Sequence, residues 1–270
     1  MRYGLREIAN VMLKAKVDGQ KVGNKTFKKG QPVCHFTTLK TSTIEGAATT
    51  VYAQGGRGNP RLIAWEGERT LTLTMEDALI SPMGIAILTG AGLIESGEAV
   101  AILTHVAENV DKKDGKFTIT KDAAEDEAAW YCVLDDEGNP TGDFKEATIA
   151  EKVVTVTESD ATAILVDYYY EESGENVATQ IDIEPGKFGG NYYLEAETLM
   201  RDEATGRDDA AEFILPNCRI QSNFTFTMAA SGDPSTFTFT VDAFPGVVKG
   251  YSSKKVLCSI QIVNETEAGE

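Results

Sequence analysis

The stretch WEGERTLTLTMEDALISPMGIAILTGAGL, residues 65–93, decides the fold because its periodicity changes halfway. Residues 70–75 alternate between threonine and an apolar residue, which predicts a strand with one buried face. Over residues 76–90 apolar side chains recur at spacings of three and four, which predicts a short helix that ends at glycine. Strand patterns fill most of the remaining chain, so we expect a mainly β fold: a β-sandwich or barrel with one packed α-helix.

The composition is typical of a folded protein. Hydrophobic residues make up 42% and charged residues 25% of the 270 positions, so the chain can bury a substantial core. No apolar run approaches the roughly 18 residues of a membrane span. The N-terminal residues lack the apolar core of a signal peptide. The four cysteines belong to no known motif, which fits a cytosolic chain with reduced thiols. Two disulfides between cysteines far apart in the sequence remain as an alternative.

Charge is distributed unevenly along the chain. The net charge is −17, yet residues 1–70 hold 12 Lys/Arg against 5 Asp/Glu, and the remainder holds 13 against 37. Residues 122–209 alone hold 24 acids against 5 bases. Phosphate contacts need clustered positive charge, so binding to free nucleic acid is disfavoured. The basic residues 1–70 and the acidic remainder suit self-association through surfaces of opposite charge. Alternatively, the acidic surface only keeps the protein in solution.

Residues 44–64 combine small residues with Gly55-Gly56, Arg57-Gly58 and Asn59-Pro60 between strand-like segments. A long excursion of this kind in a compact fold is usually functional or disordered, so we expect a flexible loop. Its Gly-Gly-Arg-Gly run is followed neither by Gly-Lys-Ser/Thr nor by a helix start, which disfavours phosphate binding.

Several shorter patterns leave alternatives open. Residues 3–16 fit one face of a helix, or a helix followed by a strand. Residues 224–228 and 237–241 both alternate phenylalanine with threonine and predict a β-hairpin. The acidic turn at 135–140 fits a hairpin tip better than a calcium loop, whose ligand spacing it lacks. The three tyrosines at 168–170 could form an aromatic platform, but strand geometry would split them between two faces.

The sequence offers little to catalysis. Its only histidines are His35 and His105, and Cys34 beside His35 would point to the opposite face of a strand. Neither CxxC nor HExxH occurs, so we expect no catalytic, cofactor or metal site. A thiolate enzyme that uses the remote His105, or a pair of carboxylates in a cleft, remains as an alternative.

Three segments resemble the major tail tube proteins of tailed bacteriophages, in particular those of long-tailed phages that infect Gram-positive hosts. They are AWEGERTLTLTMEDALISPMGIAILTGAGL (64–93), LPNCRIQSNFTFTMAASGDPSTFTFTVDAFP (215–245) and KKVLCSIQIV (254–263). The resemblance covers roughly residues 1–110 and 190–262 and none of its motifs is as specific as a metal signature. It implies a β-sandwich or barrel with one helix. Six subunits would form a ring whose inner sheets join into one β-barrel, and the rings would stack into a tube.

The resemblance also implies how the chain is divided. Residues 1–121 and 186–270 would build the tail-tube domain, and residues 122–185 would be an acidic β-rich insertion. Residues 44–64 would be the loop that stacks rings, and the basic N-terminal arm would meet acidic surface on a neighbouring ring. The interacting residues would be Thr50, Tyr52, Gln54, Gly55, Gly56, Arg57 and Asn59 in the loop, and Arg2, Tyr3 and Arg6 in the arm.

The expected partners follow from the same resemblance. The chain would bind itself, and sheath, baseplate and tail-terminator proteins are further candidates. DNA would pass through an acidic lumen without specific binding, and the protein, made in the host cytoplasm, would reside in the virion tail. Enzymatic activity, a cofactor and a membrane anchor are not expected. The alternatives are another virion-surface or carbohydrate-binding β-sandwich module, and an acidic hydrolase.

Overall fold

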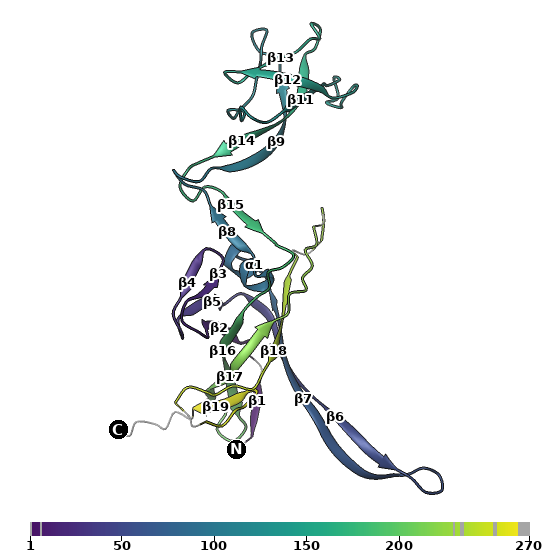
Figure 1. Ribbon diagram of the computed structural model, residues 1–270, viewed down its shortest axis with the longest axis vertical. Coiled ribbons are helices and arrows are strands. Elements are labelled where there is room, and N and C mark those ends of the chain that lie inside the picture. Colours follow the sequence, from purple (N-terminus) through teal and green to yellow (C-terminus); the bar gives the residue numbers. More distant parts are fainter. Residues whose placement is uncertain (1, 6, 229, 233–234, 251–252, 264–270) are drawn as a thin grey trace. The chain divides into compact units, whose positions relative to one another are not determined.

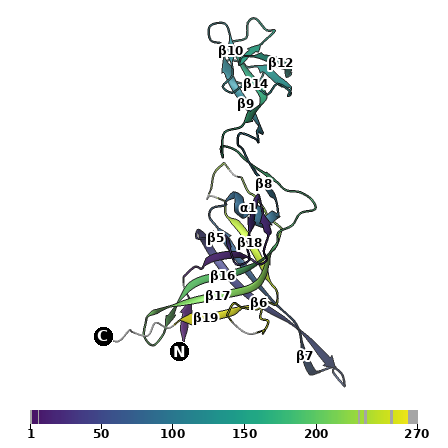
Figure 2. The same ribbon diagram turned by 60° about the vertical axis from the view of Figure 1, so that its left-hand side comes forward.

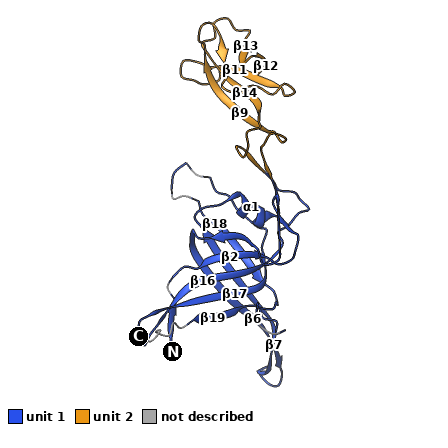
Figure 3. Ribbon diagram, turned by 90° about the vertical axis from the view of Figure 1, so that its left-hand side faces the viewer, with its two compact units in different colours: residues 1–93, 181–270 blue, residues 94–180 orange. Residues whose placement is uncertain are grey.

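The computed structural model describes residues 2–5, 7–228, 230–232, 235–250 and 253–263. The chain divides into two compact units, which Figure 3 shows in different colours. Unit 1 comprises Met1–Leu93 and Ile181–Glu270, and unit 2 comprises Ile94–Gln180. Strands dominate both units, and a single α-helix occurs in the described part of the chain, which confirms the expected fold class. That part contains no helix with the length and apolarity needed to span a membrane.

Unit 1 is built on one antiparallel sheet (Figure 1). Its strands are β1 (Tyr3–Leu5), β2 (Asn10–Ala15), β5 (Pro32–Phe36), β6 (Leu39–Gln54), β7 (Arg61–Asp77), β16 (Asn191–Asp202), β17 (Asp208–Ile220), β18 (Phe237–Ala243) and β19 (Ser259–Val263). The main path runs β5-β2-β16-β17-β18-β7-β6, while β1 pairs with β16 and β19 with β17. A small hairpin, β3 (Gln20–Val22) with β4 (Lys25–Phe27), stands apart from this sheet.

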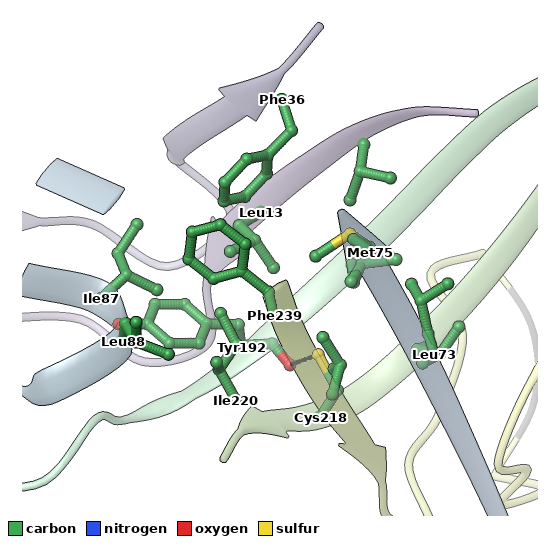
Figure 4. Close-up of a cluster of buried hydrophobic side chains, with 14 of the residues drawn as sticks. Leu13, Phe36, Leu73, Met75, Ile87, Leu88, Tyr192, Cys218, Ile220 and Phe239 are labelled. Atoms are coloured by element: carbon green, nitrogen blue, oxygen red, sulfur yellow. Dashed lines mark hydrogen bonds between the residues drawn. The ribbon is translucent and has the colours of Figure 1, made fainter. Parts of the chain in front are cut away.

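The core of unit 1 lies against one face of this sheet, which curls around it (Figure 4). Leu73 and Met75 point into the core, as the alternation of residues 70–75 predicts. The rings of Phe36 and Phe239 meet in its middle with their centroids 5.1 Å apart. Helix α1 (Pro82–Thr89) closes the core with apolar side chains such as Ile87.

The helix begins later than the sequence predicts. Ser81 is its N-cap, and the Ser81 hydroxyl accepts a hydrogen bond from the Gly84 N–H at 3.0 Å. Pro82 then occupies the first turn, where a missing N–H is harmless. The predicted start at Glu76 is wrong because β7 continues through Asp77, which pairs with Phe237 of β18. The end at Gly90 agrees with the prediction, and its φ of 74° is the left-handed conformation of a C-cap.

Two other expectations fail because tertiary pairing overrides the local pattern. The described part of residues 3–16 contains β1 and β2 and no helix. The expected helix is therefore wrong, while the strand of the helix-then-strand alternative is confirmed by β2, where Val11 and Leu13 alternate into the core. Residues 224–228 form no strand, so the predicted hairpin is absent. Strand β18 pairs with β7 and β17 instead.

Unit 2 has a six-stranded antiparallel sheet with its own core. The strand order is β10-β13-β12-β11-β14-β9. The strands are β9 (Ile102–Asp111), β10 (Phe117–Thr118), β11 (Ala129–Val133), β12 (Lys145–Ala150), β13 (Val153–Thr155) and β14 (Ala163–Glu172). The core includes Tyr131, Ile164 and Val166. Two further strands, β8 (Gly92–Glu95) and β15 (Thr179–Asp182), form a separate two-stranded sheet.

The boundaries of this unit differ from the acidic insertion expected at 122–185. The unit begins at Ile94 and ends at Gln180. Strand β9, which the sequence assigned to the tail-tube part, pairs along its whole length with β14 and places Val110 in the core of unit 2. The acidic composition therefore indicates the later part of unit 2 but does not indicate that β9 belongs to it.

Candidate assembly surfaces

The longest exposed element is a β-hairpin formed by β6 and β7. Strand β18 covers β7 only from Thr72 to Asp77, and beyond that point the two strands continue alone (Figures 1 and 2). We call residues 45–69 the hairpin arm, and almost all of its side chains are exposed. The expected flexible loop over 44–64 is therefore wrong: the segment is a paired hairpin in which only residues 55–60 turn.

The end of this arm is apolar on both of its faces. Val51 lies opposite Trp65 on one face, and Ile63 follows on the same face opposite Ala53. Tyr52 and Leu62 belong to the other face because side chains alternate along a strand. We call these five large residues the arm tip: Val51, Tyr52, Leu62, Ile63 and Trp65, which are 37–64% exposed. Exposed apolar clusters of this kind are typical of interaction surfaces.

The turn at the end of the arm is ordered by its own hydrogen bonds. The Asn59 N–H donates to the Gly56 carbonyl at 3.1 Å, and the Asn59 side-chain amide donates to Gln54 Oε1 at 3.3 Å. Asn59 has a φ of 49°, which asparagine tolerates better than most residues. The guanidinium of Arg61 stacks over the Tyr52 ring, 4.1 Å from its centroid.

The structure brings the predicted loop residues together on this arm. Three lie on β6 and four in the turn: Thr50, Tyr52 and Gln54, then Gly55, Gly56, Arg57 and Asn59. Sequence reasoning missed Val51, Ile63 and Trp65. Their alternation across two strands was the signal, but the glycines between them drew attention to a loop.

The N-terminal residues lie on their own unit. Tyr3 pairs with Asp202 as β1 extends the sheet, and Arg2 forms an ion pair with Glu203 at 3.6 Å. The predicted arm residue Arg6 lies outside the described residues. In this structure the segment is therefore an edge strand of unit 1 and does not project as a separate arm.

A groove lies between β1 and β19, over the ends of β16 and β17. It consists of two adjoining cavities of about 630 and 500 Å³ that share Glu7 and Leu199. We call it the Leu199 groove. Its large apolar residues are 38–59% exposed: Leu5, Ile8, Leu199 and Val263. Carboxylates also line it: Glu7, Glu197, Glu203, Asp208 and Glu212.

Negative charge in this groove is incompletely balanced. Glu197 lies directly opposite Glu212 in the β16–β17 pair, an arrangement in which like charges repel. Lys14 forms an ion pair with the neighbouring Glu195. Burial, with the nearby Glu195 and Glu197 carboxylates, raises the pKa of Glu212. Among the described residues, neither Glu197 nor Glu212 has a cationic side chain as an ion-pair partner.

A third surface covers the solvent side of β6, β7 and β18, and we call it the threonine face. One row across the three strands is Thr43, Thr74 and Thr240. The adjacent rows add Glu45, Thr72 and Asp242 on one side, and Thr41, Glu76 and Thr238 on the other. These three rows contain hydroxyls and carboxylates and no lysine or arginine. The surface is therefore hydrophilic and acidic.

Unit 2 exposes aromatic side chains on one face of its sheet. Trp130 lies opposite Asp167, and Tyr169 lies opposite His105 on the same face. His105 Nε2 is 2.5 Å from Asp167 Oδ1, and the His105 and Tyr169 rings meet edge to face at 5.4 Å. We call this surface the Trp130 face. The predicted splitting of the tyrosines is confirmed, because Tyr168 is 1% exposed and Tyr169 is 37% exposed.

The groups that could carry chemistry are buried or engaged. All four cysteines are free thiols, and burial raises the pKa of Cys34 to about 11 and that of Cys218 to about 12. Both thiols are therefore protonated and unreactive near neutral pH. The Asp135 carboxylate accepts hydrogen bonds from the backbone N–H groups of Glu137 and Asn139, as in a hairpin tip. The described residues include no group of three or more potential ligands placed to hold a metal ion.

Together these surfaces define a class: a β protein with an apolar arm and large polar sheet faces, organised for assembly. A model of the YomU/Tube protein family matches residues 4–254. The chain therefore belongs to the YomU/Tube family, a family of phage tube-like structural proteins. A search of curated proteins finds no match.

Proposed function

We propose that this protein polymerises as stacked hexameric rings into the tail tube of long-tailed phages that infect Gram-positive hosts. The observation that carries the proposal is the hairpin arm, whose tip exposes large apolar residues on both faces. A monomer gains nothing from such an element, because exposed apolar surface promotes association. In a polymer, a neighbouring copy would bury it. Membership of the YomU/Tube family supports the same conclusion.

In this proposal the turn and strand residues of the arm make contacts between rings. The residues are those expected from the sequence: Thr50, Tyr52, Gln54, Gly55, Gly56, Arg57 and Asn59. Arg2 and Tyr3 would contribute from the N-terminal segment of unit 1, together with Arg6, which lies outside the described residues. The outer edge of β6 would accept a strand of the next subunit, because β7 is its only strand partner among the described residues.

The threonine face would line the channel of the tube. Its carboxylates, such as Glu45 and Glu76, would repel the phosphates of DNA. DNA would then pass without adhering to the wall. Sheath, baseplate and tail-terminator proteins are the further partners that this role implies at the surface and ends of a tube.

Negative-stain electron microscopy of the purified protein, combined with sedimentation, tests this proposal. We expect rings and tubes that become scarcer as salt is raised, since contacts between charged surfaces weaken with screening. A protein that stays monomeric at high concentration, at every salt concentration tried, would contradict it.

A second candidate function concerns unit 2 alone. The exposed rings of Trp130 and Tyr169, beside the His105–Asp167 pair, suit the flat face and hydroxyls of a sugar. Unit 2 would then serve as an adhesive module on the same virion. Binding of the whole protein to a glycan array should be lost in Trp130→Ala and retained in Phe144→Ala, which removes another exposed aromatic ring of unit 2. Equal binding by both variants would remove this candidate.

A further inference from the structure

Two surfaces of unit 1 match each other in polarity and charge. We propose that the Leu199 groove of one copy receives the arm tip of a second copy of this chain. The inference rests on the proposed self-assembly and adds to it the two surfaces that meet.

Both surfaces expose large apolar side chains. Trp65 and Val51 stand opposite each other on one side of the arm, so they form a single protruding ridge. The groove is lined by Leu199, Leu5 and Val263. Its two cavities fall within the roughly 300–1,000 Å³ that is usual for sites enclosing a ligand. Docking would remove both exposed apolar surfaces from water at once.

The charges of the two surfaces also complement each other. Among the described residues that line the groove, Arg2 pairs with Glu203 and Arg201 with Asp208, whereas Glu197 and Glu212 lie opposite each other and neither has an ion-pair partner. The arm carries Arg57 in its turn and Arg61 at the start of β7, and neither has a carboxylate partner among the described residues. A guanidinium can bridge two carboxylates by several donors, so its arrival would turn a repulsive pair into an attractive cluster.

The two surfaces consist of different residues of unit 1. The groove lies over β16 and β17, between β1 and β19, whereas the arm tip lies at the far end of the hairpin formed by β6 and β7 (Figure 1). The contact would therefore be heterologous: each copy gives its arm to one neighbour and receives an arm from another. Contacts of this kind generate closed rings or continuing filaments, and both are parts of a tube.

A charge exchange tests the contact. The arm variant Arg57→Glu/Arg61→Glu and the groove variant Glu197→Arg/Glu212→Arg should each raise the critical concentration for polymerisation about tenfold or more, because each brings like charges together. An equimolar mixture of the two variants should polymerise again, since the acidic arm fits the basic groove and the native arm of the groove variant fits the native groove of the arm variant. Light scattering and electron microscopy provide the readout.

Matched controls separate this contact from a general effect of net charge. Lys25→Glu/Lys28→Glu changes the net charge by the same amount at exposed positions on and beside β4, away from the arm, and should polymerise like the native protein. Glu125→Arg/Glu127→Arg changes the net charge by the same amount as the groove variant, at exposed positions of unit 2, and should also polymerise like the native protein. Circular dichroism should show the native fold in all four.

A photocrosslink identifies the receiving surface directly. With a benzophenone amino acid in place of Trp65, mass spectrometry should find it joined to a β1, β16, β17 or β19 peptide of a second copy. Crosslinks to unit 2 or to the threonine face, or a mixture that fails to polymerise although the native protein does, would overturn the inference while leaving self-assembly intact. A native protein that never polymerises would remove the inference together with the proposed function.

Discussion

Phe36 and Phe239 meet with ring centroids 5.1 Å apart although β5 is the edge strand at one end of the sheet and β18 lies near its other end. The contact exists because the sheet curls until its two ends share one core. Phe239 is 1% exposed, and its ring also lies close to α1. A Cβ atom added at Gly84 of this helix would lie 3.9 Å from the ring. This pair therefore links β5 and β18, which lie far apart in the strand order of the sheet.

The first prediction concerns this pair. Phe239→Ala should lower the free energy of unfolding of unit 1 by about 3–5 kcal/mol, because it leaves a cavity where the sheet closes. Phe244→Ala, at an exposed ring one residue beyond β18, should change the free energy by less than about 0.5 kcal/mol. Urea titrations of both variants measure the difference. Equal losses would show that the curl does not depend on Phe239.

The second prediction concerns the end of α1. Gly90 has a φ of 74°, and a Cβ there would lie 2.4 Å from the Phe188 carbonyl carbon. Gly90→Ala should lower the free energy of unfolding by more than the roughly 1–2 kcal/mol of a left-handed residue alone. Gly92→Ala, where a Cβ meets nothing within 4 Å, should change it by less than about 1 kcal/mol. Thermal unfolding that treats both variants alike would contradict this account.

The third prediction is a pH dependence in unit 2. The Lys145 ammonium and the Tyr131 hydroxyl lower the pKa of Glu158 from 4.5 to about 2. A carboxylate with a lowered folded pKa stabilises the fold above pH 4.5, and that contribution disappears as the pH falls toward 2. Unfolding of unit 2 should therefore become easier over this range, and Glu158→Gln should flatten the dependence. Tyrosine fluorescence during acid titration would show this, and an unchanged profile in the variant would refute it.

The fourth prediction concerns the arm tip. Val51→Asp/Trp65→Asp places charge on both members of an exposed cross-strand pair and should abolish tubes while leaving the fold intact. Phe144→Asp, at an exposed ring of unit 2, should leave them unchanged. Sedimentation velocity compares the two. Normal tubes from the arm variant would mean that the tip is not an assembly surface.

The fifth prediction concerns the threonine face. Thr74→Lys and Thr240→Lys, which are neighbours in one row, should leave tubes intact but slow DNA release from phage that carry them, because ammonium groups attract phosphate. The neutral pair Thr74→Ser/Thr240→Ser should release DNA at the native rate. Release of DNA is followed by dye fluorescence. Native rates in the lysine variant would place this face away from the channel.

The sequence was sufficient for the fold class and for the strand at residues 70–75, because a two-residue period reports burial on one face directly. It was insufficient for the start of α1, since Glu76 and Asp77 suit a helix N-terminus locally and their pairing with β18 and β6 keeps them in a strand. For the residues of the arm the sequence predicts a loop. Gly55 and Gly56 indicate a loop more strongly than the alternation of Val51, Ile63 and Trp65 indicates paired strands. The sequence gives no indication of the Leu199 groove, because Leu5, Leu199 and Val263 come from three distant segments of the chain.

The central claim is that identical copies complete one another. Electron cryomicroscopy of the assembled protein tests it most directly. We predict a tube with six copies per ring, the threonine face toward the channel and each arm tip against another copy. A reconstruction in which the arm tips reach solvent, or in which the threonine face lies on the outside, would contradict the account.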